Sequence, residues 1–210
     1  MALINMLSVV TMYFVLLFAL TVHECAHALA AEYCGDSTAR FMGRISLNPL
    51  AHIDPIGTVL IPLVMMFTGA RFLIGWAKPV MVNPRNFRNF RRDDILVSMA
   101  GIAANVTLAV LVALVLRLMM VAKLDPGPGL ANLLLFLMWI NTALAVFNII
   151  PIPPLDGSHV LEHFLPPELA EGYRRLGAFS FIILIVLIYT RVIHILIAVP
   201  TVVLMKIAGV

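Results

Sequence analysis

Two histidines and a glutamate stand close together inside an apolar stretch, in the sequence VHECAHALA at residues 22–30. Residues four apart share one face of a helix, so His23 and His27 can bind one metal ion together. Glu24 can then reach a water molecule at that ion. HExxH on a helix is the arrangement of zinc hydrolases, in which the glutamate is the general base. A packed polar face is the alternative, but ionisable groups in a membrane segment are functional by default, which favours a metal site.

A hydrolytic zinc site usually has three protein ligands and one open position, so a third ligand is needed. The best candidate is Asp156, in the sequence NIIPIPPLDGSHV at residues 148–160. The prolines before it stop any helix, and irregular backbone at membrane depth is tolerated only where it lines a cavity or is buried in protein. A plain loop aspartate is the alternative, but the break and the following Gly157 favour a ligand turn. We therefore expect one Zn²⁺ per chain.

The composition is that of an integral membrane protein. Of the 210 residues, 62% are hydrophobic and 12% are charged, and the mean hydropathy is +1.03. A soluble domain carries about twice that charged fraction. The length fits one compact unit, so residues 1–210 are expected to form a single membrane-embedded domain.

The net charge of +3 is small, but the basic residues are unevenly distributed. A cluster in one connecting segment comprises Arg71, Lys78, Arg85, Arg88, Arg91 and Arg92. This segment lacks the aromatic stacking platform of a nucleic-acid-binding protein, so we expect no such partner. Membrane proteins keep basic clusters on the cytoplasmic side, and topology is the better explanation.

Five apolar runs are expected to form the membrane region: residues 3–33, 56–69, 95–121, 130–150 and 178–208. The first, third and fourth can cross a hydrocarbon layer of about 30 Å. The second would span only about 21 Å as a helix, so we expect a re-entrant or embedded segment. The last contains Arg191, where we expect a break, a snorkelling side chain or a pair with a carboxylate that the sequence does not identify. The predicted fold is an all-α multi-pass membrane protein, with three transmembrane helices around the zinc site and a C-terminal membrane helix region.

The ligands can meet only if the spans run in particular directions. His23, His27 and Asp156 lie toward the carboxyl ends of their runs, so the first and fourth runs must be parallel and the third antiparallel. Residues 35–94 then begin and end on one side, which the positive-inside rule assigns to the cytoplasm. The metal would lie roughly 10 Å below that surface of the cell membrane.

The connecting segment 36–54 contains a candidate substrate clamp. Ile45 and Leu47 alternate with Arg44 and Ser46, which indicates a short strand or hairpin on the cytoplasmic side. A substrate helix hides its peptide groups in internal hydrogen bonds, so an unwound substrate needs backbone partners. These four residues could supply them by β-addition. A hairpin that only connects two spans is the alternative, and both interpretations stay open.

Taken together, the motifs resemble the site-2 protease family of intramembrane zinc metalloproteases, peptidase family M50. The resemblance is carried by HECAH, NIIPIPPLDG and AGIAAN, and it extends across most of the chain. GRISLNPLAHIDPIGT and GWAKPVMVNPRNFR are similar to the compact subgroup without a PDZ domain. Ile102 stands where the family often has proline, and His159 where lysine or glycine is more familiar.

The resemblance implies a role for each motif residue. His23, His27 and Asp156 would bind zinc, and Glu24 would be the general base. Asn148 would steady the substrate carbonyl or the developing oxyanion, which an amide donor can do. The implied activity is hydrolysis of peptide bonds in or near transmembrane segments, so the partners are membrane-protein or transmembrane-peptide substrates and the lipid bilayer.

Two other functions fit parts of the sequence. A metal transporter or metal-dependent membrane receptor can use intramembrane histidine and aspartate, but it has no need of a glutamate beside the first ligand. An inactive scaffold has no need of the complete set of ligands, base and asparagine. The sequence names neither the physiological substrate nor the oligomeric state.

Several other polar residues are expected to have structural roles. His159 and His163 are four apart, but a solvated helix is favoured over a second metal site. His52 is expected to hydrogen-bond its loop, and an outer-shell role toward the zinc stays open. Gly101 and Asn105 have a spacing suited to close helix packing, and packing alone is the favoured interpretation.

Overall fold

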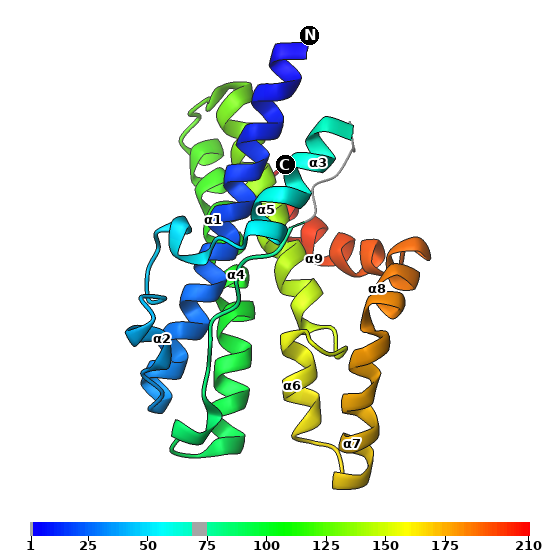
Figure 1. The fold of residues 1–210 in the computed structure, drawn as a ribbon. Coiled ribbons are helices and arrows are strands. Elements are labelled where there is room, and N and C mark those ends of the chain that lie inside the picture. Colours follow the sequence, from blue (N-terminus) through cyan, green and yellow to red (C-terminus); the bar gives the residue numbers. More distant parts are fainter. Residues whose placement is uncertain (1, 69–74) are drawn as a thin grey trace.

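The first apolar run forms one long helix, α1, from Ala2 to Cys34. The computed structural model describes residues 2–68 and 75–210. No proline or glycine interrupts this run before Gly35, so nothing in its sequence breaks the helix. Figure 1 shows α1 extending along much of the height of the molecule.

Two further helices complete the core. α4 runs from Phe90 to Val121, and the side chain of Asn89 caps it by accepting a hydrogen bond from the backbone N–H of Arg92. α5 runs from Gly127 to Ile149 after the turn DPGPG. In Figure 1, α1 and α5 descend and α4 ascends, so the first and fourth runs are parallel and the third is antiparallel, as expected.

Small side chains allow α4 to pack closely against its neighbours. Ala109 and Ala113 of α4 are buried together with Met138 of α5, and Ala19 of α1 is buried with Ile140 of α5. Close approach of this kind maximises van der Waals contact between helices in apolar surroundings. Within the described residues, the segments long and apolar enough to cross a membrane are Val10–Cys34, Phe90–Val121, Gly127–Ile149 and Pro167–Tyr189. The chain is therefore an all-α multi-pass membrane protein.

The second apolar run is too short to cross, as expected. Pro55–Leu60 forms a π-helical turn, and α3 follows over Ile61–Thr68. A helix of the length of α3 spans only about 12 Å. The hydroxyl of Tyr13 on α1 donates to the backbone carbonyl of Thr58 at 2.6 Å, which holds the segment against α1. Gly69, at the end of the predicted run, lies outside the described residues.

The strand expected at Arg44–Leu47 is not formed, and the described residues contain no strand at all. The segment follows the short helix α2, Thr38–Phe41, and the backbone N–H of Arg44 donates to the carbonyl of Ala39 at 2.9 Å. The guanidinium of Arg44 donates to the carbonyl of Ala51, which folds the loop back on itself. Hydrogen bonds within the loop thus replace the backbone hydrogen bonds that a partner strand would provide. The prediction of a strand at Arg44–Leu47 was wrong.

An extended segment, residues 76–83, passes beside α1 on its way to α4. Asp36 anchors its end, because the carboxylate accepts from the backbone N–H of Asn83 and from the amide of Asn86, both at 2.7 Å. Burial raises the pKa of Asp36, but hydrogen bonds from Thr38, Asn83 and Asn86 outweigh this effect and lower the pKa below its ordinary value. The ionised carboxylate is therefore a fixed attachment point for the loop.

The C-terminal region is broken at Arg191, which is one of the alternatives expected there. This residue has a φ of 61° and separates α8, Ser180–Tyr189, from α9, Val192–Ala208. α9 turns back onto the core, where Leu204 and Ala208 are buried against α4 and α5. The last run is thus two helices rather than one.

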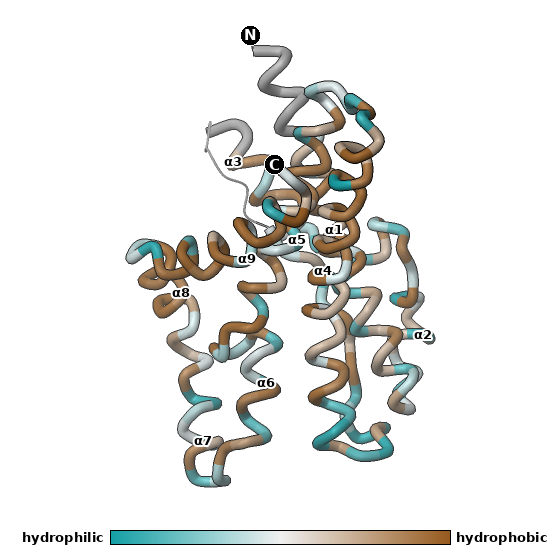
Figure 2. The backbone as a smooth tube through the Cα atoms, turned by 180° about the vertical axis from the view of Figure 1, so that it is seen from behind, coloured by the Kyte–Doolittle hydropathy of each residue, from teal (hydrophilic) through white to brown (hydrophobic). Residues whose placement is uncertain are grey.

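Hydrophilic residues gather at one end of the molecule. Figure 2 shows them at α2, at the start of α4 and at α7, Pro167–Arg175, whereas the middle of the bundle is hydrophobic. α6, Asp156–Glu162, leads from the end of α5 toward the same end. Arg85 and Arg88 of the basic cluster are exposed there, and Arg71 lies outside the described residues.

We expect Asp36→Ala to loosen the loop before α4, because hydrogen bonds to a charged group contribute about 1.5–3 kcal/mol each. Trypsin should then cut after Arg85 and Arg88 faster in detergent-solubilised protein. Asp125→Ala is a matched control, because its carboxylate bonds only the backbone N–H of Gly127 at the turn before α5. Equal cleavage rates in both variants would contradict an anchoring role for Asp36.

Candidate metal centre

The two histidines of the HExxH motif point from α1 into the protein interior. The side chains are buried, with His23 5% and His27 9% exposed. Their rings are roughly perpendicular, and the two Nε2 atoms are 3.0 Å apart. The spacing of four residues thus places both nitrogens at one point, as helical geometry requires.

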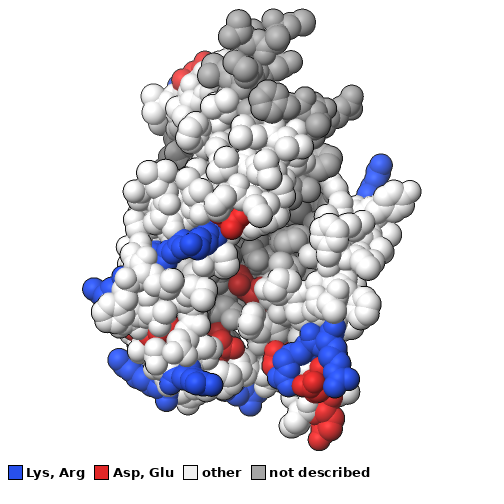
Figure 3. Space-filling view, in the orientation of Figure 1, with Lys and Arg blue, Asp and Glu red and all other residues white. Residues whose placement is uncertain are grey.

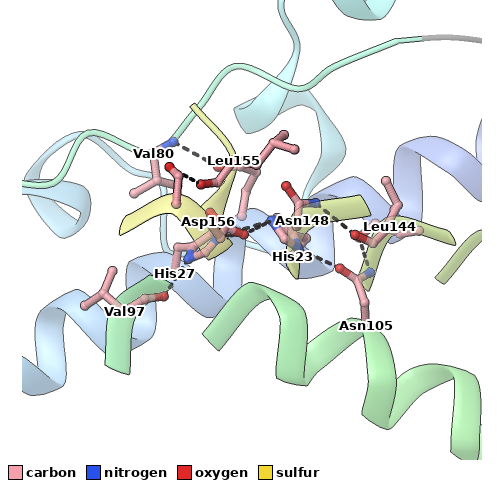
Figure 4. A network of polar contacts seen from close by, with 12 residues as sticks. His23, His27, Val80, Val97, Asn105, Leu144, Asn148, Leu155 and Asp156 are labelled. Carbon is pink, nitrogen blue, oxygen red and sulfur yellow. Dashed lines mark hydrogen bonds and ion pairs between the residues drawn. The ribbon is translucent and has the colours of Figure 1, made fainter. Parts of the chain in front are cut away.

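Asp156 reaches the same point from the break that follows α5. α5 ends at Ile149, and after the proline-rich turn Asp156 begins α6. Gly157 is required here, because a Cβ at this position would lie 2.2 Å from the backbone oxygen of Ile149. The Oδ2 atom of Asp156 lies 3.3 Å from Nε2 of His23 and 3.4 Å from Nε2 of His27. The structure therefore brings the three predicted ligands together (Figure 4).

Hydrogen bonds on the other side of the rings leave the converging nitrogens as acceptors. Nδ1 of His27 lies 2.7 Å from the carbonyl oxygen of Val97, which can only accept, so in the neutral ring Nδ1 carries the proton and Nε2 holds a lone pair. Nδ1 of His23 lies 2.6 Å from Oδ1 of Asn105. Ring nitrogens of metal-bound histidines are typically fixed in this way by a second partner.

These atoms form a set that suits a divalent metal ion. The two imidazole nitrogens and a carboxylate oxygen lie within 4.8 Å of one another, and Oδ2 of Asp156 is buried with no hydrogen-bond donor among the described residues. Electron-rich atoms this close repel one another unless a cation lies between them. Two histidines and one carboxylate are a ligand set of catalytic zinc, which keeps a fourth position open.

One face of α4 borders the site and packs against the two histidine rings. Val97, Gly101 and Asn105 are spaced by four and therefore line one stripe of the helix. A Cβ at Gly101 would lie 2.4 Å from Nε2 of His27, so only glycine leaves space for the rings. The packing interpretation therefore holds for Gly101, whose missing Cβ lets α4 approach the rings, but it was wrong for Asn105, which hydrogen-bonds the predicted ligand His23.

The ligands lie at the wall of a cavity of about 450 Å³ that Glu24 and Asn148 also line. The backbone N–H of Val80, in the extended segment, donates to Oε2 of Glu24 at 2.9 Å. Nδ2 of Asn148 donates to the carbonyl of Leu144 at 3.0 Å. Figure 3 shows acidic side chains inside the hollow of the molecular surface. The predicted base, the predicted oxyanion donor and the ligands thus share one cavity.

Other predicted residues lie elsewhere or have other contacts. The cavity lining includes none of Arg44–Leu47, although it includes residues 79–82 of the extended segment. His52 bonds the carbonyl of Ser46 at 2.9 Å, within its own loop. His163 pairs with Asp94 at 2.7 Å, and no second cluster of three metal-binding side chains occurs among the described residues.

Sequence reasoning also missed Asp94 and His159 in the cavity wall, and the backbone groups of Val80 and Val97 that bond Glu24 and His27. Asp94 is an acidic residue at the start of an apolar run, which was a usable signal. A backbone N–H carries no sequence signal, so the contact of Val80 was not predictable.

We expect Gly101→Ala to abolish metal binding, because the added methyl group overlaps both imidazole rings. Zinc content of the purified protein, measured by elemental analysis, should fall to background. Gly172→Ala on α7 is the matched control, since a Cβ there would meet no described atom within 4 Å beyond its chain neighbours and its own helix backbone. Full zinc content in Gly101→Ala would show that the rings are not confined by α4.

Comparison with known proteins agrees with this chemistry. Residues 118–189 match the model of Peptidase family M50. The chain is 38% identical over 179 residues to "Putative zinc metalloprotease YwhC" of Bacillus subtilis (strain 168), which covers 83% of this chain and 78% of that protein. It is 32% identical over 175 residues to "Putative zinc metalloprotease Rip2" of Mycolicibacterium smegmatis, covering 83% of this chain and 64% of that protein. No solved structure matches the chain. With a His-His-Asp centre inside a helical membrane protein, this chain belongs to peptidase family M50 and is a zinc metalloprotease.

Proposed function

We propose that this protein is an intramembrane endopeptidase that cleaves transmembrane segments of other membrane proteins, with one zinc ion per chain. The observation that carries the proposal is the position of the cavity. Two of the ligands come from α1 and the third from the break that follows α5, and both of these helices are long and apolar enough to cross a membrane. A substrate that reaches this cavity through the bilayer would be a membrane segment rather than a soluble chain.

Zinc held by His23, His27 and Asp156 would lower the pKa of a bound water to about 7 and polarise the substrate carbonyl. Glu24 would take a proton from the attacking water as general base. It would then deliver this proton to the leaving nitrogen as the peptide C–N bond breaks. The N–H of Val80 holds Oε2 of Glu24, and the other carboxylate oxygen would exchange protons with the water.

Asn148 would stabilise the oxyanion that forms on the substrate carbonyl. Its amide has two N–H groups, and the carbonyl of Leu144 engages only one of them. The second can donate into the cavity that Asn148 lines. A donor already fixed by its own helix needs little reorganisation during the reaction, which is the basis of oxyanion stabilisation.

The cytoplasmic side of the cell membrane is the proposed location of the cavity mouth. α1 ends and α4 begins at the polar end of the molecule, together with the exposed Arg85, Arg88 and Arg91. Basic residues next to membrane spans concentrate in the cytoplasm. The peptide bond that is cut would therefore lie near the cytoplasmic face.

Glu24→Gln should retain zinc but lose cleavage by about 10²-fold or more, because general acid–base catalysis contributes at least that factor. The measurement is hydrolysis of a fluorescent transmembrane peptide in proteoliposomes, alongside zinc content. Glu32→Gln is the control, since Glu32 on the same helix pairs with Arg40 outside the cavity. If a metal transporter is the true function, Glu24→Gln keeps zinc flux and the parent protein releases no peptide.

Asp156→Ala and Asn148→Ala should separate the ligand from the oxyanion donor. Asp156→Ala removes one of three ligands, so both zinc content and cleavage should fall. Asn148→Ala should retain zinc and slow turnover by about 10²-fold, as for other lost oxyanion donors. Normal zinc affinity in Asp156→Ala would exclude it as a ligand, and unchanged turnover in Asn148→Ala would remove it from the mechanism.

Residues 79–82 of the extended segment line the cavity, so they are a second candidate for binding an unwound substrate strand, beside Arg44–Leu47. Proline removes a backbone donor, so Met81→Pro would impair pairing with a substrate strand along residues 79–82. Ile45→Pro makes the same change outside the cavity lining. We expect Met81→Pro to lower cleavage at constant zinc content and Ile45→Pro to leave it near the parent value. The reverse order would support the clamp at Arg44–Leu47.

A further inference from the structure

We infer that Asn141 and Asn105 are positioning residues that determine which ring nitrogen of His23 carries the proton. They form a chain of hydrogen bonds from the backbone of α5, through α4, to the histidine on α1. The inference rests on the zinc-binding role of the site and not on the identity of the substrate.

Both asparagines are fully buried at 0% exposure, although they lie in apolar helices. Burying an amide away from water costs free energy unless its groups are hydrogen-bonded. Nδ2 of Asn105 lies 2.7 Å from Oδ1 of Asn141, and Nδ2 of Asn141 lies 2.8 Å from the carbonyl oxygen of Leu137. Oδ1 of Asn105 lies 2.6 Å from Nδ1 of His23.

Leu137, at the end of this series of hydrogen bonds farthest from His23, determines which group donates and which accepts at each step. A backbone carbonyl can only accept, so Asn141 must direct its NH₂ group to Leu137 and its oxygen to Asn105. Asn105 must then direct its NH₂ group to Asn141, and the carbonyl of Ala19 at 3.4 Å favours the same orientation. The oxygen of Asn105 is left for His23. Turning over either amide would place oxygen against oxygen.

The consequence for His23 is that Nδ1 must donate and therefore carries the proton. In the neutral ring, Nε2, which faces Asp156 and His27, then has the lone pair that a metal ion requires. His27 reaches the same state through the carbonyl of Val97 alone. An amide offers both a donor and an acceptor, so Asn105 needs Asn141 to hold it in the correct orientation.

The inference can be tested through the affinity of the metal-free protein for Zn²⁺, measured by chelator competition without any substrate. Asn141→Leu removes the acceptor that orients Asn105, and affinity should fall about 10-fold, within the range for outer-shell partners of metal ligands. Thr142→Val is the matched control: Thr142 is buried beside Asn141, but among the described residues its hydroxyl bonds the carbonyl of Met138 in its own helix and no residue of another helix. Its affinity should equal that of the parent.

A second set of variants distinguishes an effect on the orientation of the Asn105 amide from a general effect on helix packing. Asn105→Asp presents an oxygen to His23 whichever way the group turns, so adding Asn141→Leu to it should cause no further loss of affinity. Additive losses in the double variant, or equal losses in Asn141→Leu and Thr142→Val, would reduce the asparagines to packing residues.

Nitrogen-15 spectra of the histidine rings provide a direct measurement that needs no variant of the chain. In the metal-free parent, His23 should be the Nδ1–H tautomer. An Nε2–H tautomer there would overturn the inference, whereas the proposed peptidase activity would be unaffected by that result.

Discussion

His23, His27 and Asp156 direct two imidazole nitrogens and a carboxylate oxygen to one point among helices that are otherwise mostly apolar. Such atoms repel one another, and apolar surroundings screen that repulsion poorly. A divalent cation turns the repulsion into attraction, so metal binding and the packing of the helices that carry the ligands are coupled. Much of the remaining structure holds the two imidazole nitrogens and the carboxylate oxygen in place.

α4 provides no metal ligand, yet it has a large influence on the metal centre. Three residues spaced by four along one face each contribute something different: Val97 a carbonyl, Gly101 space and Asn105 an amide. A shift of α4 by one residue along its axis would displace all three from the rings. The small side chains that allow α4 to approach α1 and α5 are therefore part of the metal centre as well as of the core.

The proposed reaction would consume water inside an apolar bundle, so it needs both an opening for water and surroundings of low dielectric constant. The cavity lies between the ligands and the extended segment before α4, and Val80 of that segment bonds the predicted base Glu24. Asp36 fastens the far end of the same segment. The extended segment thus completes a site whose ligands lie on helices. A fixed dipole such as the N–H of Val80 acts more strongly in apolar surroundings than in water.

The sequence by itself determined the three core spans, their directions and the meeting of the HExxH histidines with the aspartate of the proline-rich break, whereas for Arg191 a break was only one of the alternatives, and the span Pro167–Tyr189 begins before the predicted run. Helical periodicity, the free-energy cost of ionisable groups in apolar segments, and proline and glycine chemistry are local properties that sequence records. The strand predicted at Arg44–Leu47 failed because alternation cannot reveal whether a partner strand exists. Only the tertiary structure decided the roles of Asn105 and Asn141. A buried amide or hydroxyl can bond its own helix, as Thr142 does, or a side chain on another helix, and only the packing of the helices determines which partner is within reach.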